Sequence, residues 1–73
     1  MAYSSQPQKL KWTDTLEIAI QLADANPDVD PTQVRFTALM HMVLGLPEFD
    51  DVPERCGERI LEAIQQAWID EIG

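Results

Sequence analysis

The sequence predicts a mainly α-helical single domain, in which three helices surround one small core. Three segments place apolar residues at the i, i+3, i+4, i+7 spacing of an amphipathic helix, whereas the alternating pattern of a β-strand is almost absent. The length of 73 residues also favours one domain, because a chain of this size buries only about 60% of its unfolded surface. So thin a core leaves little room for a deep catalytic pocket.

The first helix is expected to have Thr13 or Asp14 as its cap and to run to about Ala25. Asp14 and Glu17 have the spacing of a capping box, in which two side chains bond the free N–H groups at a helix start. The apolar residues that should face the core are Leu16, Ile18, Ala19, Ile20, Leu22 and Ala23. The opposite side is polar and mostly acidic, with Asp14, Glu17, Gln21 and Asp24. Upstream, Trp12 is large and apolar, so it is expected to anchor the start of the domain to the core.

The second helix is expected over about Ala38 to Leu46, with Thr37 as its cap and Gly45 near its end. Its apolar residues are Leu39, Met40, Val43, Leu44 and Leu46. Before it, Asn26-Pro27 ends the first helix, because a residue that precedes proline disfavours the helical conformation. Asp30-Pro31 has the order of a cap followed by a first helical residue, which predicts a single turn there.

The third helix, expected over residues 58–72, is the element that combines the core with a functional surface. Its core side consists of Ile60, Leu61, Ile64, Ala67 and Trp68. Glu58 and Glu62 share another side of the helix, and Ile69 points the same way. The segment before it, Glu48 to Cys56, carries four more carboxylates, and we call it the acidic loop. We therefore expect one side of this helix to pack on the domain and the other side, with the acidic loop, to bind a partner.

The charge of the chain narrows the class of partner. All thirteen acidic residues lie between Asp14 and Glu71, and residues 12–73 carry three arginines against them, a formal charge of −10. Lys9 and Lys11 bring the whole chain to −8. This field repels nucleic acid and anionic membranes, which need a cationic surface, and attracts cations and basic proteins. The alternative interpretation is that the acidity only keeps a small protein soluble.

The N-terminal segment gives no sign of targeting. Residues 1–8 are polar, without a basic start or an apolar stretch, so they predict a disordered leader rather than a secretory signal. No apolar run approaches the roughly 20 residues that a membrane span needs. The single Cys56 rules out a disulfide within the chain and fits a reducing compartment. We therefore expect a leader over residues 1–8, a helical domain over 9–73, and a monomeric cytoplasmic protein.

The acidic loop also contains the candidate metal ligands, which are Glu48, Asp50, Asp51 and Glu54. Carboxylates are hard oxygen ligands that suit Mg²⁺, Ca²⁺, Mn²⁺ or Fe²⁺. The alternative is a solvated acidic approach to a helix start, which the helix dipole favours without any metal. Asp24, Asp28 and Asp30 lie close together in sequence and raise the question of a calcium-binding loop. Such a loop needs a glutamate at its twelfth position, but that position is Arg35 when counted from Asp24 and Leu39 when counted from Asp28. Capping and solvation explain these residues better.

Catalytic residues are not evident. The sequence has no Ser/His/Asp set, no phosphate-binding loop and no glycine-rich turn. His41, the single histidine, lies among apolar neighbours and is expected to be a partly buried packing residue. Cys56 lies near a helix start, a position that lowers the pKa of a thiol, but it has no second cysteine as a partner. We therefore expect that the protein is not an enzyme.

Six segments, taken in order, carry a resemblance to a known family. They are Lys11-Trp12-Thr13-Asp14, Glu17-Ile18-Ala19, Pro27-Asp28-Val29-Asp30-Pro31, Val34-Arg35-Phe36-Thr37, Phe49-Asp50-Asp51 with Pro53, and Glu58 to Glu71. In this order and spacing the chain resembles the IscX family of small acidic proteins from bacterial iron–sulfur cluster assembly. The resemblance extends from Lys9 to Glu71 without a gap.

The resemblance implies a winged-helix-like fold with an acidic surface and a place beside the cysteine desulfurase IscS. Members of the family bind ferrous iron weakly through surface carboxylates, and they are thought to compete with frataxin and ferredoxin for one basic surface of the desulfurase. The chain departs from the family pattern at four positions, which are Ala38, Met40, Met42 and Val52. These changes affect metal ligands more than the last helix, so we favour the contact with the desulfurase over the contact with iron.

Two hypotheses follow. The first is an adaptor or regulator that docks onto the desulfurase through Asp50, Asp51, Glu58, Glu62, Ile69, Asp70 and Glu71. The second is an iron carrier that uses the acidic loop and whose protein contacts are incidental. A winged-helix nucleic-acid binder would rest on fold shape alone and conflicts with the charge of −10 on residues 12–73.

Overall fold

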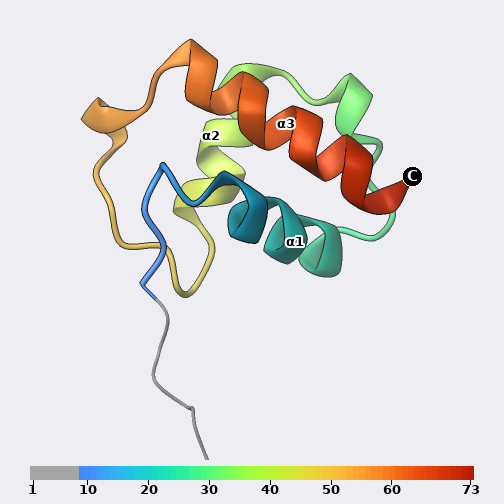
Figure 1. The fold of residues 1–73 in the computed structure, drawn as a ribbon, viewed down its shortest axis with the longest axis horizontal. Coiled ribbons are helices and arrows are strands. Elements are labelled where there is room, and N and C mark those ends of the chain that lie inside the picture. The colour runs from blue at the N-terminus through green and yellow to red at the C-terminus, as the bar shows by residue number, and fades with distance from the viewer. Residues whose placement is uncertain (1–8) are drawn as a thin grey trace, which may run out of the picture.

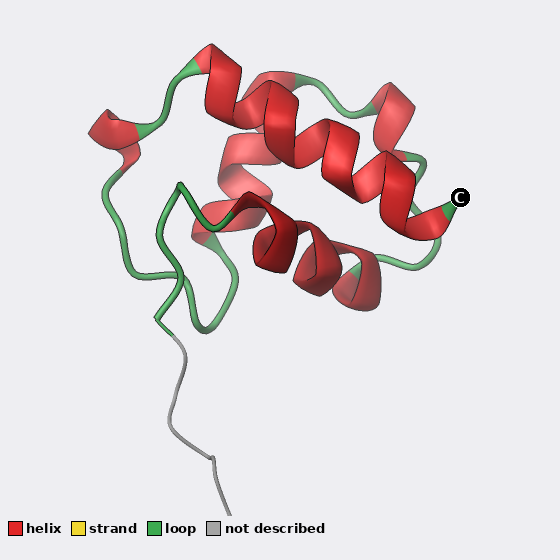
Figure 2. Cartoon of the chain, viewed as in Figure 1, coloured by secondary structure: helices red, strands yellow, loops and turns green. Residues whose placement is uncertain are grey.

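The computed structural model describes residues 9–73, and it contains three α-helices and two 3₁₀ turns (Figure 1). The elements are α1 (Thr15–Ala25), η1 (Pro31–Gln33), α2 (Phe36–Leu44), η2 (Pro53–Arg55) and α3 (Glu58–Ile72). No strand forms in this part of the chain, where Leu10 and Phe49 make one isolated parallel bridge (Figure 2). The prediction of a mainly α, three-helix domain is confirmed, while the leader predicted over residues 1–8 lies outside the described residues.

Helix α3 packs against both other helices, and its contact with α1 is the most extensive in the domain. The fully or nearly fully buried core draws on every helix and on the segment before α1. It consists of Leu10, Trp12, Ile18, Ala19, Leu22, Leu39, Val43, Leu46, Leu61, Ile64 and Trp68. Both tryptophans are buried, as predicted. None of the helices in residues 9–73 has the length and apolar character that crossing a membrane requires.

The first helix begins and ends where the sequence predicts, with Asp14 as its N-cap residue, but two details of its first turn differ. Asp14 occupies the N-cap position, yet its side chain does not cap the helix. Its Oδ2 instead accepts a hydrogen bond from the Lys11 amide at 2.9 Å, so the predicted capping box does not form. Leu16 is 61% exposed, whereas Leu22 on the same helix is fully buried. The predicted apolar arc was too wide, because α3 covers only the side formed by Ile18, Ala19 and Leu22.

Helix α2 begins at Phe36, two residues before its predicted start, and ends at Leu44, two residues before its predicted end. Arg35, in extended conformation, is the N-cap, and its carbonyl accepts the first helical bond from the Leu39 amide at 2.8 Å. Phe36 packs against the core, so packing of this ring rather than capping by Thr37 sets the helix start. Leu46 is buried although it follows the helix.

The turn at η1 and the bounds of α3 confirm the sequence-based predictions. Asp30 Oδ1 accepts hydrogen bonds from the Thr32 amide at 3.0 Å and from the Thr32 hydroxyl at 2.7 Å, with Pro31 as the first residue of the turn. On α3, Gln65 Nε2 donates to the carbonyls of Pro31 at 2.8 Å and Val34 at 3.2 Å. Gln65, which the sequence did not single out, therefore fastens η1 to α3.

Candidate functional site

The acidic loop lies beside the segment that leads into α1, and backbone bonds join the two. The Leu10 amide donates to the Glu48 carbonyl at 2.9 Å, and the Asp50 amide donates to the Leu10 carbonyl at 2.8 Å. The Trp12 indole Nε1 donates to the Val52 carbonyl at 2.7 Å. Two segments almost 40 residues apart in sequence thus define one surface.

Asp51 lies at the centre of this junction, and both of its carboxylate oxygens are hydrogen-bonded within the chain. Oδ1 accepts from the Val52 amide at 2.8 Å, and Oδ2 accepts from the Trp12 amide at 3.1 Å. Partial desolvation alone raises the pKa of Asp51, but these two bonds and the nearby charges of Arg55 and Lys11 outweigh it and hold the pKa below 3.8. Asp51 is therefore an anionic, half-buried acceptor.

The other carboxylates of the acidic loop are exposed and point to different neighbours. Asp50 Oδ2 lies 3.6 Å from Lys11 Nζ and 3.9 Å from Lys9 Nζ. Glu48 Oε1 accepts from Gln21 Nε2 on α1 at 2.8 Å. Glu54 lies in the first turn of η2. Ion pairs this exposed are worth only about 0–1 kcal/mol, so they orient the loop more than they stabilise the fold.

The four predicted metal ligands are not gathered into one coordination site. Within residues 9–73 no three or more His, Cys, Asp or Glu side chains come together in a way that holds a metal ion. A high-affinity site for Fe²⁺ needs several donors at once, and here two of the carboxylates are engaged by Lys and backbone groups. The loop is not a preformed metal site.

The outer side of α3 presents the predicted acidic stripe. Glu58 and Glu62 are exposed and lie one turn apart, while Leu61 and Ile64 on the other side of the helix are buried. Near the C-terminal end of α3, Asp70 and Glu71 are exposed as well. Ile69, the predicted apolar anchor, is partly buried. Asp70 Oδ1 accepts from Gln66 Nε2 at 3.2 Å.

Two predictions about single residues need correction. His41 is exposed on α2 rather than packed against the core, because the buried residues Leu39 and Val43 each lie two residues away and place His41 on the opposite side of the helix. Cys56 is partly buried against the core, and desolvation raises the pKa of its thiol instead of lowering it. Neither residue has the surroundings of an activated nucleophile.

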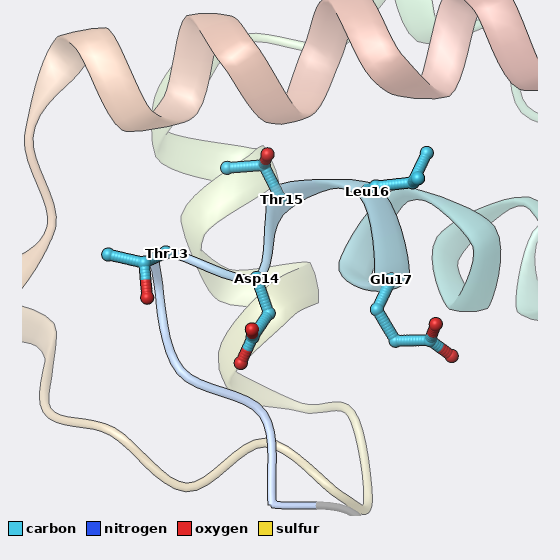
Figure 3. Close-up of a pocket in the computed structure, with 5 residues that line it drawn as sticks. All are labelled: Thr13, Asp14, Thr15, Leu16 and Glu17. Carbon is cyan, nitrogen blue, oxygen red and sulfur yellow. The ribbon is translucent and has the colours of Figure 1, made fainter.

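Two shallow hollows flank the start of α1, and neither was predictable from the sequence. One is lined by Thr13, Asp14, Thr15, Leu16 and Glu17 (Figure 3). In that view the side chains of Asp14 and Glu17 extend to one side of the chain, and Leu16 extends to the other (Figure 3). The second hollow is lined by Lys11, Trp12, Thr13, Asp51, Arg55 and Ile60. Both are open depressions, which agrees with the thin core expected of so short a chain.

Comparisons with known proteins identify the family of this chain. A family model described as iron-sulphur cluster assembly matches residues 10–73. The chain is also similar to a Pseudomonas aeruginosa protein named "Uncharacterized protein PA3808", with 61% identity over 62 residues, covering 85% of this chain and 94% of the relative. The match spans the acidic loop and all three helices. The chain therefore belongs to the iron–sulphur cluster assembly family, that of IscX, as the sequence predicted, and this family implies a role in iron–sulphur cluster assembly.

Proposed function

We propose that the protein is a non-enzymatic adaptor of iron–sulphur cluster assembly, which docks its acidic surface onto a basic surface of the cysteine desulfurase IscS. In this role it acts in the cytoplasm as a monomer and competes with frataxin and ferredoxin for the same basic surface. Membership in this family supports a role in iron–sulphur cluster assembly. The charge of −10 on residues 12–73 supports a partner surface that is positively charged. Strong charge of one sign speeds encounter with a partner of the opposite sign.

The observation that carries this proposal is the division of α3 into two sides. Leu61, Ile64 and Trp68 are buried in the core, so the helix is held rigidly in the domain. Glu58 and Glu62 stand on its exposed side. Because their backbone is already fixed, a partner meets these two charges without having to order the helix, which lowers the entropic cost of binding. Asp50, Asp70 and Glu71 extend the acidic surface beyond this stripe.

For ferrous iron we propose weak, modulating binding rather than a carrier function. The exposed carboxylates Glu48, Asp50 and Glu54 supply the hard oxygen donors that Fe²⁺ accepts. These carboxylates are not gathered into a group of three that could hold a metal ion, and Asp50 faces two lysines. An ion bound by one or two such carboxylates keeps most of its water, so its affinity is low. This arrangement favours the adaptor over the iron carrier.

A comparison of two charge-matched variants tests the docking surface. The variant Glu58→Gln/Glu62→Gln removes two negative charges from the first turns of α3, and Asp24→Asn/Asp28→Asn removes two from the end of α1 and the loop after it, which lie away from the start of α3 (Figure 1). Calorimetric titration of the desulfurase in iron-free buffer should show a roughly threefold to tenfold loss of affinity for the α3 variant. The control variant should change the affinity by less than about twofold. Equal losses in both variants would mean that only the total charge matters, and α3 would not be the docking surface.

A further inference from the structure

The segment Lys9–Trp12, which we call the clasp, holds the acidic loop in place through contacts that the proposed docking does not use. The Leu10 amide donates a hydrogen bond to the Glu48 carbonyl, and the Leu10 carbonyl accepts one from the Asp50 amide. Trp12 then holds the next part of the loop, because its indole donates to the Val52 carbonyl at 2.7 Å. Leu10 and Trp12 are 3% and 1% exposed, so the clasp itself is anchored in the core.

Asp51 completes the connection from the side of the loop. Its two carboxylate oxygens accept the amides of Trp12 and Val52, at 3.1 and 2.8 Å. Each oxygen of Asp51 already accepts one bond within the chain, so a partner lysine or arginine would have to share these oxygens with the two amides. Asp51 thus differs from Asp50, which is exposed and faces the lysines of the clasp.

We propose that Asp51 and Trp12 are positioning residues, which fix the acidic loop in the conformation that presents Asp50 and Glu54 to the desulfurase without touching it themselves. This inference rests on the proposed docking function. Between α2 and α3 the loop contains one 3₁₀ turn, η2, as its regular element. Without the clasp, the loop would have to be ordered at the moment of binding, and the backbone entropy lost in that step would weaken the affinity.

The geometry and the charge of the acidic loop can be separated with two variants and one matched control. Trp12→Phe keeps an aromatic ring and the net charge but loses the bond from the indole to the Val52 carbonyl. Asp51→Asn removes one charge, and Asp50→Asn removes one charge from the adjacent exposed residue as its matched control. If charge alone governs docking, Trp12→Phe has no effect, and the two asparagine variants behave alike.

The first readout is amide hydrogen exchange of the free protein, measured by NMR. In Trp12→Phe and Asp51→Asn the amides of residues 50–56 should exchange about threefold to tenfold faster, the range that one lost hydrogen bond gives. The amides in the middle of α3 should stay strongly protected, which shows that the variants are folded. Unchanged exchange of the loop in both variants would overturn the inference, whatever the desulfurase does.

The second readout is the affinity for the desulfurase and its dependence on salt. Trp12→Phe should bind about threefold to tenfold more weakly with the same salt dependence as the wild type, and Asp51→Asn should lose more affinity than Asp50→Asn. Faster exchange with unaltered affinity in both variants would show that order in the loop is irrelevant to docking, and would also overturn the inference. If the wild type itself does not bind, the docking function fails, and with it the positioning role, while exchange still decides whether the clasp orders the loop.

Discussion

Trp12 meets Phe49 edge to face, with ring centroids 4.7 Å apart and ring planes at 69°. The first ring belongs to the clasp and the second to the acidic loop, so this pair joins the beginning of the domain to the segment between α2 and α3. Pairs of this geometry contribute about 0.5–1.5 kcal/mol beyond the area they bury. The contact explains why a residue so near the N-terminus belongs to the core of the domain.

Loss of the Trp12 side chain should therefore destabilise the whole domain. Trp12→Ala removes a ring that is 1% exposed, and large-to-small changes of this kind cost about 3–5 kcal/mol. Urea unfolding followed by far-ultraviolet circular dichroism should show a large drop in the midpoint. Trp12→Phe should lose clearly less. A midpoint equal to that of the wild type in Trp12→Ala would contradict the described packing of this residue.

Two leucines of α1 should respond differently to the same substitution. Leu22→Ala leaves a cavity between α1 and α3 and should cost about 2–5 kcal/mol. Leu16→Ala changes a side chain that is 61% exposed, so the free energy of unfolding should move by no more than about 0.5 kcal/mol. Thermal unfolding of both variants in one buffer tests this contrast. Equal losses would show that Leu16 is buried after all.

Acid should weaken the turn at η1. The hydrogen bonds from the Thr32 hydroxyl and the Thr32 amide lower the pKa of Asp30 below its ordinary value of 3.8. A depressed folded-state pKa means that the unfolded chain takes up the proton first, so Asp30 contributes stability above about pH 4. That contribution is lost as the pH falls through the lower, folded-state value.

Asp30→Asn tests this linkage when its stability is compared with that of the wild type across the acid range. The two proteins should differ at neutral pH, and the difference should shrink as the pH drops below about 4. Asp28→Asn, in the same loop, provides a control. A difference between Asp30→Asn and the wild type that stays constant down to the lowest pH would show that the ionised carboxylate has no special role.

The thiol of Cys56 should be a slow nucleophile. Desolvation raises its pKa above 9.0, and the thiolate is the form that reacts. Alkylation by iodoacetamide, followed by mass spectrometry, should be slower in the folded protein than in urea at every pH near neutrality. The alkylation rate of the folded protein should also keep rising at pH values where the alkylation rate of the unfolded protein no longer changes. Faster alkylation of the folded protein would contradict the burial of this side chain.

Helical periodicity alone predicted the last helix correctly, because Leu61, Ile64 and Trp68 recur on one side and Gly57 precedes a clear start. The same rule misplaced the start of α2, since packing of Phe36, a tertiary effect, outweighed the capping preference of Thr37. Leu16 was assigned to the core because periodicity gives the apolar side of a helix but not the width that its neighbours cover.

The candidate site was predictable in composition but not in arrangement. The sequence identifies the acidic residues of the loop and of α3, and charge alone indicates a basic partner. The bond between Asp51 and Trp12 joins residues 39 apart, and no local spacing pairs them. For the same reason the four predicted metal ligands look alike in sequence, although in the fold Asp51 bonds two amides and Asp50 faces two lysines.

The measurement that tests the account most directly is an NMR titration of isotope-labelled protein with its cognate desulfurase in iron-free buffer. The account predicts chemical-shift changes or broadening at Glu58, Glu62 and Ile69 and in the loop around Asp50, weakening as rising ionic strength shortens the screening length from about 10 Å at 0.1 M to about 3 Å at 1 M. Signals of Asp24 and Asp28 should stay in place. Binding that appears only after Fe²⁺ is added, or that moves signals away from α3 and the acidic loop, would contradict an adaptor that docks through its acidic surface.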